Sequence, residues 1–195
     1  LDLAEFVEVF SAVLGNSPQA MKLKEIVHNA YLNHSNLASA TRYLVHTLFG
    51  YEGLLVIDGN SPELKRVFIP QITSELRTQQ AFTTVSKTNI QLKKIDSAYK
   101  IQVNPRELNL FYLKENLRER IVKKDEIYTV LNTNISWDLA GILDEVNSNP
   151  ERFSPNVIMR PLYQETILPN LCYVGGGGEL SYWLQLKSYF EAEHI

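Results

Sequence analysis

The chain has 195 residues, and its 45% hydrophobic and 21% charged residues are typical of a globular protein with an ordinary core. Its 19 basic and 22 acidic residues give a formal net charge of −3, which argues against a nucleic-acid-binding protein because neutralising phosphates needs a basic excess. The single cysteine, Cys172, excludes an internal disulfide and a thiolate metal cage and favours a cytoplasmic origin, and no apolar run approaches the roughly 20 residues that span a bilayer.

Residues 1–52 predict a helical lead-in. Ser17-Pro18 is typical of a helix start, because serine caps free N–H groups and proline fits the first helical position. A glycine, Gly50, is expected to end the last of these helices. Apolar residues recur at helical spacing around positions 6–13, 23–31 and 37–48. Because the helical pattern is already under way at the first residues, we expect this chain to be an internal piece of a longer protein.

Residues 53–98 predict the first strand and helix of an α/β unit. Leu54–Ile57 is a short, continuously apolar run followed by an Asp-Gly turn, which is typical of a strand covered on both faces in a parallel sheet. Ser61-Pro62 then starts another helix. Helical patches continue to about Ile95, although Pro70 must break or kink them.

Residues 99–132 predict an antiparallel insertion. Short alternating segments separated by turn-like residues indicate a meander of strands with one face in water, and they lie at 101–103, 110–113, 118–122 and 127–131.

Residues 133–195 predict a second α/β segment. Ser136 is expected to cap a helix that runs to about Asn147. Asn170–Val174 resembles a strand, four glycines follow it, and Glu179–Glu191 carries the apolar stripe of a helix. The elements together predict an α/β fold with a helical lead-in, a partly parallel sheet and an antiparallel insertion.

The glycine turn Gly175-Gly176-Gly177-Gly178, followed by Glu179, is the first candidate site. A backbone without Cβ can approach a ligand closely, and the helix N-terminus offers free N–H groups to an anion. In an α/β sheet such a turn also lies at the carboxyl end of a strand, where ligands bind. The alternative is a plain tight turn. The run lacks the ending of a P-loop, and Leu180 stands where a dinucleotide fingerprint has its third glycine.

The second candidate site is a group of polar residues between two prolines, namely Arg160, Tyr163, Gln164 and Glu165. Prolines fix the backbone, and polar groups on a fixed backbone suit substrate positioning. The alternative is an ordinary ion pair between Arg160 and Glu165.

Other polar residues carry weaker signals. Arg106, Glu107 and Asn109 precede a predicted strand, where a salt link explains them as well as a site does. The four histidines lack the i, i+4 spacing of a zinc helix, so no metal site is predicted. Cys172 lies in a predicted strand and is expected to be a buried, inert thiol.

Three blocks of residues, in the same order, resemble the BshC family. The first comprises Gly53-Leu54-Leu55-Val56-Ile57-Asp58 and Pro62-Glu63-Leu64-Lys65, and the second is Arg106-Glu107-Leu108-Asn109-Leu110-Phe111-Tyr112-Leu113. The third resembles the family's central block and comprises Phe153-Ser154-Pro155-Asn156-Val157, Arg160-Pro161-Leu162-Tyr163-Gln164-Glu165, Leu168-Pro169-Asn170, Tyr173-Val174-Gly175-Gly176, Gly178-Glu179 and Tyr182-Trp183-Leu184-Gln185-Leu186-Lys187. Gly177 departs from the family, which commonly has proline there, and the family's early His/Gly-rich nucleotide loop is not in this chain.

The resemblance implies the central region of a bacillithiol-biosynthesis ligase that adds L-cysteine to glucosaminyl malate. The new bond is an amide between the cysteine carboxyl and the sugar amine. Because a carboxylate does not condense unaided with an amine in water, activation by ATP or another nucleotide is implied. The resemblance further implies a Rossmann-like fold, a cytoplasmic enzyme, and a homodimer formed through a region outside this chain. The chain alone is expected to be inactive.

In such an enzyme we expect the glycine turn and the helix after it to form one wall of the ligand cleft. Arg160 is the candidate for an anionic group, and Glu165 or Glu179 for an amine; no catalytic base is identified. Two alternatives remain: another nucleotide-dependent α/β transferase with the same architecture, and a non-catalytic region that docks a partner protein.

Overall fold

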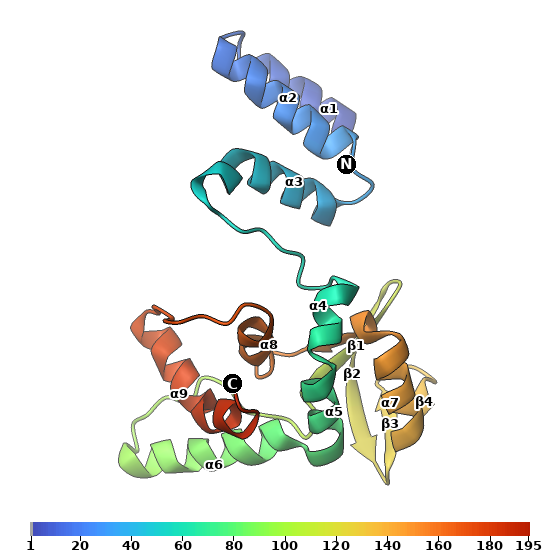
Figure 1. Cartoon of the computed structure of the whole chain (residues 1–195), viewed down its shortest axis with the longest axis vertical. Helices are drawn as coiled ribbons and strands as arrows, with labels where there is room; N and C mark the ends of the chain where they lie inside the picture. The colour runs from blue at the N-terminus through green and yellow to red at the C-terminus, as the bar shows by residue number, and fades with distance from the viewer. Residues whose placement is uncertain (1) are drawn as a thin grey trace. The chain divides into compact units, whose positions relative to one another are not determined.

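The computed structural model describes residues 2–195 (Figure 1). The backbone packs as two compact units, one ending at Gly59 and the other running from Asn60 to Ile195. Among the described residues, no helix has both the length and the apolar character needed to cross a membrane.

The first unit is helical, as the sequence predicts, with α1 at Leu3–Val13, α2 at Pro18–Leu32, α3 at Leu37–Phe49 and a short 3-10 turn, η1, at Gly50–Glu52. Each α-helix begins at a side-chain cap: the oxygens of Asp2, Ser17 and Asn36 accept hydrogen bonds from backbone N–H groups of the first turn. Local caps and apolar spacing therefore define these helices.

The predicted strand at Leu54–Ile57 is absent from this structure. The segment is extended but pairs with no strand of the described residues, and Leu55 is 66% exposed. An apolar run shows the tendency to form a strand, but a strand also needs a neighbour to receive its backbone hydrogen bonds.

The second unit begins with α4 at Pro62–Val67, α5 at Ile69–Thr78 and α6 at Gln80–Ile95. The expected break at Pro70 is confirmed, because α4 ends before this proline and α5 begins with it in the first turn. A second break falls at Gln79, which adopts a left-handed conformation with φ of 53°. Later helices are α7 at Leu139–Ser148, α8 at Arg160–Ile167 and α9 at Gly177–Ala192, with a 3-10 turn, η2, at Pro150–Arg152.

The sheet has five strands in the order β4-β3-β2-β1-β5, and every pair is antiparallel. The strands are β1 at Leu110–Lys114, β2 at Leu117–Lys124, β3 at Ile127–Val130, β4 at Ser136–Trp137 and β5 at Phe153–Pro155. The predicted antiparallel meander is thus confirmed from β1 to β3. No strand forms at 101–103, and the predicted parallel pairing is not found among residues 2–195.

Two further expectations need correction. Ser136 lies in β4 and does not cap a helix; the cap of α7 is Asp138, whose carboxylate accepts the Gly141 N–H at 2.7 Å. The predicted strand at Asn170–Val174 is also absent, and the segment is irregular. Cys172 is consequently exposed and not buried, because the buried strand that was expected to contain it does not form.

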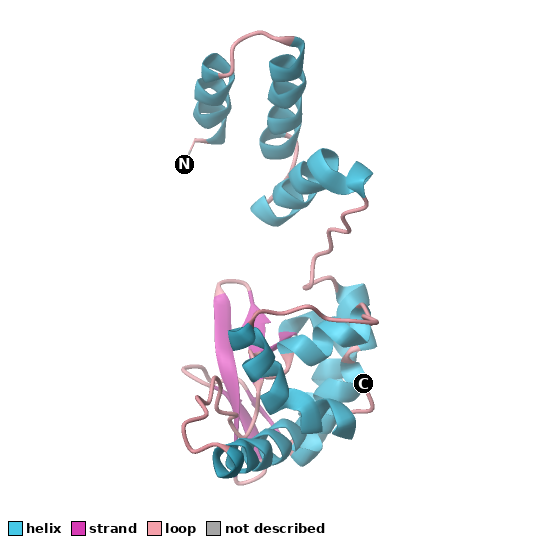
Figure 2. Cartoon of the chain, turned by 90° about the vertical axis from the view of Figure 1, so that its left-hand side faces the viewer, coloured by secondary structure: helices cyan, strands magenta, loops and turns pink. Residues whose placement is uncertain are grey.

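One face of the sheet is buried under helices, as Figure 2 shows for the second unit. The Tyr128 hydroxyl of β3 donates to the Leu76 carbonyl of α5 at 2.7 Å, which joins sheet and helix directly. Because side chains alternate along a strand, one set of positions is buried and the other faces outward. The buried set is Leu110, Tyr112, Ile121, Tyr128 and Val130.

Helix α9 is held against α6 by buried polar contacts. The fully buried amide of Gln185 donates to Asn89 Oδ1 at 2.5 Å and to the Val103 carbonyl at 3.0 Å, and accepts the Gln102 N–H at 2.7 Å. Every polar atom of this amide is therefore satisfied. These bonds hold the middle of α9, whose N-terminus lies at the glycine turn.

Candidate functional site

The four glycines form an exposed approach to α9. Gly176 is the N-cap of the helix, and it offers no side chain to the free N–H groups of the first turn. None of the four has a positive φ, and a Cβ built at Gly176, Gly177 or Gly178 would meet nothing within 4 Å. Neither backbone conformation nor packing within this chain therefore requires glycine at these three positions.

Arg160, Tyr173, Glu179 and Tyr182 gather beside this turn. The Tyr173 hydroxyl donates to Glu179, and the Tyr182 hydroxyl donates to the Val157 carbonyl. The Tyr173 ring also packs against Trp183, with centroids 4.5 Å apart and the ring planes tilted by 32°. A guanidinium, two phenols and a carboxylate thus lie at the uncapped end of a long helix.

The electrostatics show that these groups act on one another. The hydrogen bond to Glu179 raises the pKa of Tyr173, and the Arg160 charge opposes that rise. Burial raises the pKa of Tyr182, and Arg160 again opposes it through its charge and a hydrogen bond. Arg160 is therefore close enough to both phenols to stabilise negative charge beside them.

The predicted site residues of α8 lie on different faces of the helix. Arg160 and Gln164 are four residues apart and bonded to each other, Nη1 to Oε1, at 3.2 Å. Tyr163 points into the core, where its ring lies 4.9 Å from that of Phe68. Tyr163 consequently supports the fold and does not join the exposed cluster.

Glu165 is occupied by the turn after α8. Its carboxylate accepts the Asn170 N–H at 3.0 Å and the Asn170 side-chain amide at 2.8 and 3.0 Å. The alternative ion pair between Arg160 and Glu165 is not among the salt bridges of the described residues. Glu179, which meets only one phenol, is the carboxylate of this region better placed to receive a ligand amine.

A recess of about 600 Å³ lies between the segment after α8 and one side of α9. Its walls include Glu165, Asn170, Tyr173, Trp183 and Phe190. The four glycines, Arg160, Gln164 and Glu179 do not line it. Tyr173 is the residue that belongs both to this recess and to the cluster at the glycine turn.

Sequence reasoning missed two members of the cluster. Tyr173 and Tyr182 enter only through the blocks that resemble the family, and neither is predicted as a site residue. Tyr173 precedes Glu179 by six residues across the glycine turn, and a turn of that length returns the chain on itself. That spacing could have indicated that Tyr173 lies near Glu179. Among residues 2–195, no group of three or more His, Cys, Asp or Glu side chains is arranged to hold a metal ion.

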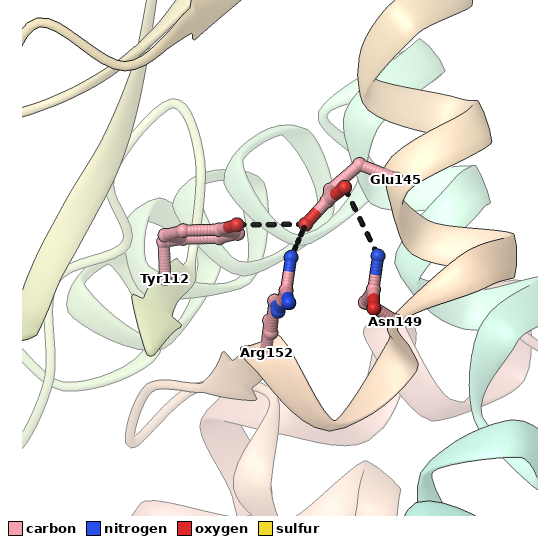
Figure 3. Close-up of polar contacts among 4 residues, drawn as sticks. All are labelled: Tyr112, Glu145, Asn149 and Arg152. Atoms are coloured by element: carbon pink, nitrogen blue, oxygen red, sulfur yellow. Dashed lines mark hydrogen bonds and ion pairs between the residues drawn. The ribbon is translucent and has the colours of Figure 1, made fainter. Parts of the chain in front are cut away.

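A separate polar cluster ties α7 to the sheet (Figure 3). The Glu145 carboxylate accepts hydrogen bonds from the Tyr112 hydroxyl at 2.7 Å, from Arg152 at 2.8 Å and from Asn149 at 3.1 Å. Burial and the contact with Glu145 raise the pKa of Tyr112 to about 12. These residues satisfy one another, so the cluster is a structural link.

Similarity to known proteins extends over the whole chain. A family model described as "Bacillithiol biosynthesis BshC, N-terminal Rossmann-like domain" matches residues 1–195. A Flavobacterium johnsoniae protein is 53% identical over 193 residues, which are 99% of this chain and 36% of that protein. A Christiangramia forsetii protein is 50% identical over 194 residues, with the same two shares. A Shouchella clausii protein is 33% identical over 192 residues, or 97% of this chain and 35% of that protein.

All three relatives carry the name "Putative cysteine ligase BshC". The chain spans about 36% of the length of the first two. The family model assigns the match to the N-terminal Rossmann-like domain, which corrects the expectation of a central region. The chain belongs to the BshC family, within that N-terminal domain.

Proposed function

We propose that this chain is part of a ligase that joins the carboxyl group of L-cysteine to the amine of glucosaminyl malate. The observation that carries the proposal is the family match over residues 1–195, together with relatives named as cysteine ligases. Because the chain spans about 36% of those relatives, the activity belongs to the full-length protein and not to this chain alone.

Forming an amide in water requires an activated carboxyl group, and ATP or another nucleotide is the proposed source of activation. The uncapped N-terminus of α9 suits a phosphate, because its free N–H groups and the helix dipole favour negative charge. Glycines with open space at their Cβ positions let a ligand approach the backbone closely. The glycine turn is therefore the proposed wall of the ligand cleft.

Arg160 and Glu179 have the chemistry to bind the two kinds of group that the reaction involves, an anion and an amine. Arg160 is exposed, and its charge reaches both phenols of the cluster, so it is the proposed partner of a carboxylate or phosphate. Glu179 is the proposed acceptor for an amine. Tyr173 and Trp183, whose rings pack against each other, would border the same ligand.

The parallel part of the sheet is also a proposal. The segments 54–57 and 170–174 are apolar, exposed and without strand partners among the described residues. Each would become a strand by pairing with segments of the full-length protein that lie outside this chain. The full-length enzyme is further proposed to act in the cytoplasm on small molecules, and to form a homodimer through a region outside this chain.

The test uses the full-length protein that contains this chain. Deletion of its gene should abolish cellular bacillithiol, measured as the labelled thiol by chromatography, and the wild-type gene should restore it. An Arg160→Ala gene should restore it poorly, with ligase turnover reduced about 100-fold, the scale of losing one charge-stabilising donor. Arg77→Ala, which removes an exposed arginine of α5, is the matched control and should restore the thiol fully.

Two outcomes would overturn parts of this proposal. A thiol pool unchanged by the deletion would remove the ligase assignment. Full turnover by Arg160→Ala, combined with weakened association with another protein, would make this surface a docking region.

A further inference from the structure

A network of buried hydrogen bonds surrounds the loop that leads into β1. Asn109 is fully buried, and its side-chain oxygen accepts the Arg106 N–H at 3.2 Å while its amide donates to the Arg106 carbonyl at 2.8 Å. The Asn156 amide donates to the same Asn109 oxygen at 2.9 Å. These bonds fix the backbone of residues 106–109.

A buried carboxylate anchors this loop from the core side. Glu75 of α5 is fully buried and accepts the Asn109 N–H at 3.0 Å and the Asn109 side-chain amide at 2.8 Å. Its other oxygen accepts the Ala81 N–H at 3.0 Å. Burial raises the pKa of Glu75, so the fold bears a desolvation cost to hold this loop in place.

The fixed loop presents two charged side chains to a recess of about 350 Å³. Arg106 and Glu107 line it from the loop, and Arg120 lines it from the outward-facing positions of β2. The remaining lining residues are Pro105, Leu108, Ile121 and Val122. Apolar and charged residues therefore line the recess together, and the charged ones come from two elements.

Neither guanidinium is neutralised within the described residues. No hydrogen bond or ion pair of Arg106 or Arg120 side chains occurs there, and Glu107 makes no salt bridge. The neighbouring outward residue of β2, Arg118, lies with its guanidinium carbon 3.9 Å from the centre of the Phe111 ring. Two positive residues and one negative residue therefore line the recess, and this excess of positive charge favours an anion.

We propose that this recess binds a small oxyanion, a carboxylate or a phosphate, held between the guanidiniums of Arg106 and Arg120. Arginine suits this role because its planar donors match two oxygens of either group. The loop is fixed before the ligand arrives, so little backbone freedom is lost on binding. Glu107 limits the negative charge that the recess accepts, which favours a small anion over a polyanion.

This site is separate from the glycine turn, and its existence does not depend on the ligase assignment. The two sources of the oxyanion are a small carboxylic acid and a phosphate group. L-malate represents the first source, a choice that rests on the proposed function, and inorganic phosphate represents the second.

The experiment is arginine labelling of the full-length protein with phenylglyoxal, followed residue by residue by peptide mass spectrometry. Labelling rates of Arg106 and Arg120 are measured against rising L-malate or phosphate, with sodium chloride at equal ionic strength as the reference. We expect saturable protection of both arginines, by about tenfold at saturation, with at least one of the probes. Arg77, exposed on α5, is the internal control and should label at a constant rate.

Variants sharpen the result. Arg120→Ala should raise the anion concentration that gives half-protection of Arg106 about tenfold, because one charged donor is lost. Glu107→Gln should lower that concentration, because it removes an opposing carboxylate. Since the readout is labelling and not turnover, a failed ligase assignment leaves it interpretable.

Equal labelling of Arg106, Arg120 and Arg77 with both probes would overturn the proposal. So would protection of Arg106 that persists unchanged in Arg120→Ala. Protection by malate alone identifies a carboxylate ligand, and protection by phosphate alone identifies a phosphate ligand.

Discussion

At the scale of single residues, Asn109 has more structural consequence than its weak signal in the sequence indicates. Its side chain bonds Glu75, Asn156 and both backbone groups of Arg106. Asparagine ahead of a strand looks like an ordinary turn residue, because its partners lie 34 and 47 positions away. Such contacts between distant positions are invisible to local patterns.

Replacing Asn109 with alanine should therefore destabilise the second unit by about 2–4 kcal/mol. The change leaves the buried Glu75 carboxylate and the Arg106 backbone with missing partners, and such groups are costly when unsatisfied. Urea unfolding followed by circular dichroism measures the loss. Asn104→Ala, at an exposed position nearby, should change the unfolding free energy by less than about 0.5 kcal/mol. Equal losses in the two variants would contradict the role given to Asn109.

Glu145 gives a prediction about pH. Burial alone would raise its pKa, but hydrogen bonds from Tyr112 and Arg152 lower it below the ordinary value. A carboxyl group with a lowered folded-state pKa stabilises the fold above its unfolded pKa, near about 4.3, and that stability is lost as pH falls through the folded pKa. Glu145→Gln should cost about 1 kcal/mol at pH 7, and the difference from wild type should shrink toward pH 3.

The matched control for that experiment is Glu191→Gln. Glu191 pairs with Lys187 on the surface, where both side chains are more than half exposed, at 61% and 67%. Solvent screens such a pair, so this variant should follow the wild-type pH dependence in thermal unfolding. If the difference in unfolding free energy between wild type and Glu145→Gln stayed constant from pH 7 to pH 3, the charge of the carboxylate would not be the cause of the stabilisation.

The candidate site also shows what local sequence can and cannot place. Arg160 and Glu179 were chosen for their chemistry beside prolines and glycines, and the structure places both near Tyr173. Tyr163 was chosen on the same grounds, yet it packs on Phe68. Proximity in sequence cannot tell which face of a helix a residue occupies until the helix is known, and α8 was not expected at 160–167.

At the scale of elements, helices and hairpins were predictable and isolated strands were not. The cap at Ser17 and the turns within the meander act between residues close in sequence, so α2 and the strands from β1 to β3 follow from local patterns. The segments at 54–57 and 170–174 have the apolar character of strands but find no partner among the described residues. Pairing is a property of two segments, and one sequence window shows only one of them.

A substitution in the glycine turn is expected to raise stability and to lower function. Gly178→Ala should stabilise α9 by about 0.5–1 kcal/mol, because alanine has less freedom to lose and its Cβ meets nothing within 4 Å. Turnover of the full-length enzyme should nevertheless fall if a ligand approaches this backbone closely. Thermal unfolding and a ligase assay measure the two effects.

Gly15→Ala provides the contrasting control. Gly15 has a φ of 72°, a conformation that alanine rarely adopts, so this change should lower stability by about 1 kcal/mol while leaving turnover unchanged. If Gly178→Ala kept full turnover, the glycines would be a plain turn.

At the scale of the whole molecule, the surface of the second unit is more apolar near α9 than an isolated globular protein would favour. Leu171 is fully exposed, Val174 is 90% exposed, and Leu180 and Leu184 are about half exposed, at 49% and 50%. Contiguous exposed apolar residues usually mark an interaction surface. The matched region is about 36% of the length of the first two relatives, so those proteins have further polypeptide outside it.

This leads to a prediction about backbone protection. Among the described residues, no backbone hydrogen bond joins 171–174 to another segment, so these amides should exchange with solvent rapidly in the 195-residue chain. In the full-length protein they should exchange at least about 100-fold more slowly, because a neighbouring strand would take up their N–H groups. Hydrogen–deuterium exchange with mass spectrometry compares the two forms. Amides of α6, which are already bonded within their helix, should change little between them. Rapid exchange at 171–174 in both forms would show that the segment is an irregular connection in the full-length protein too. It would then not be a strand of the proposed parallel sheet.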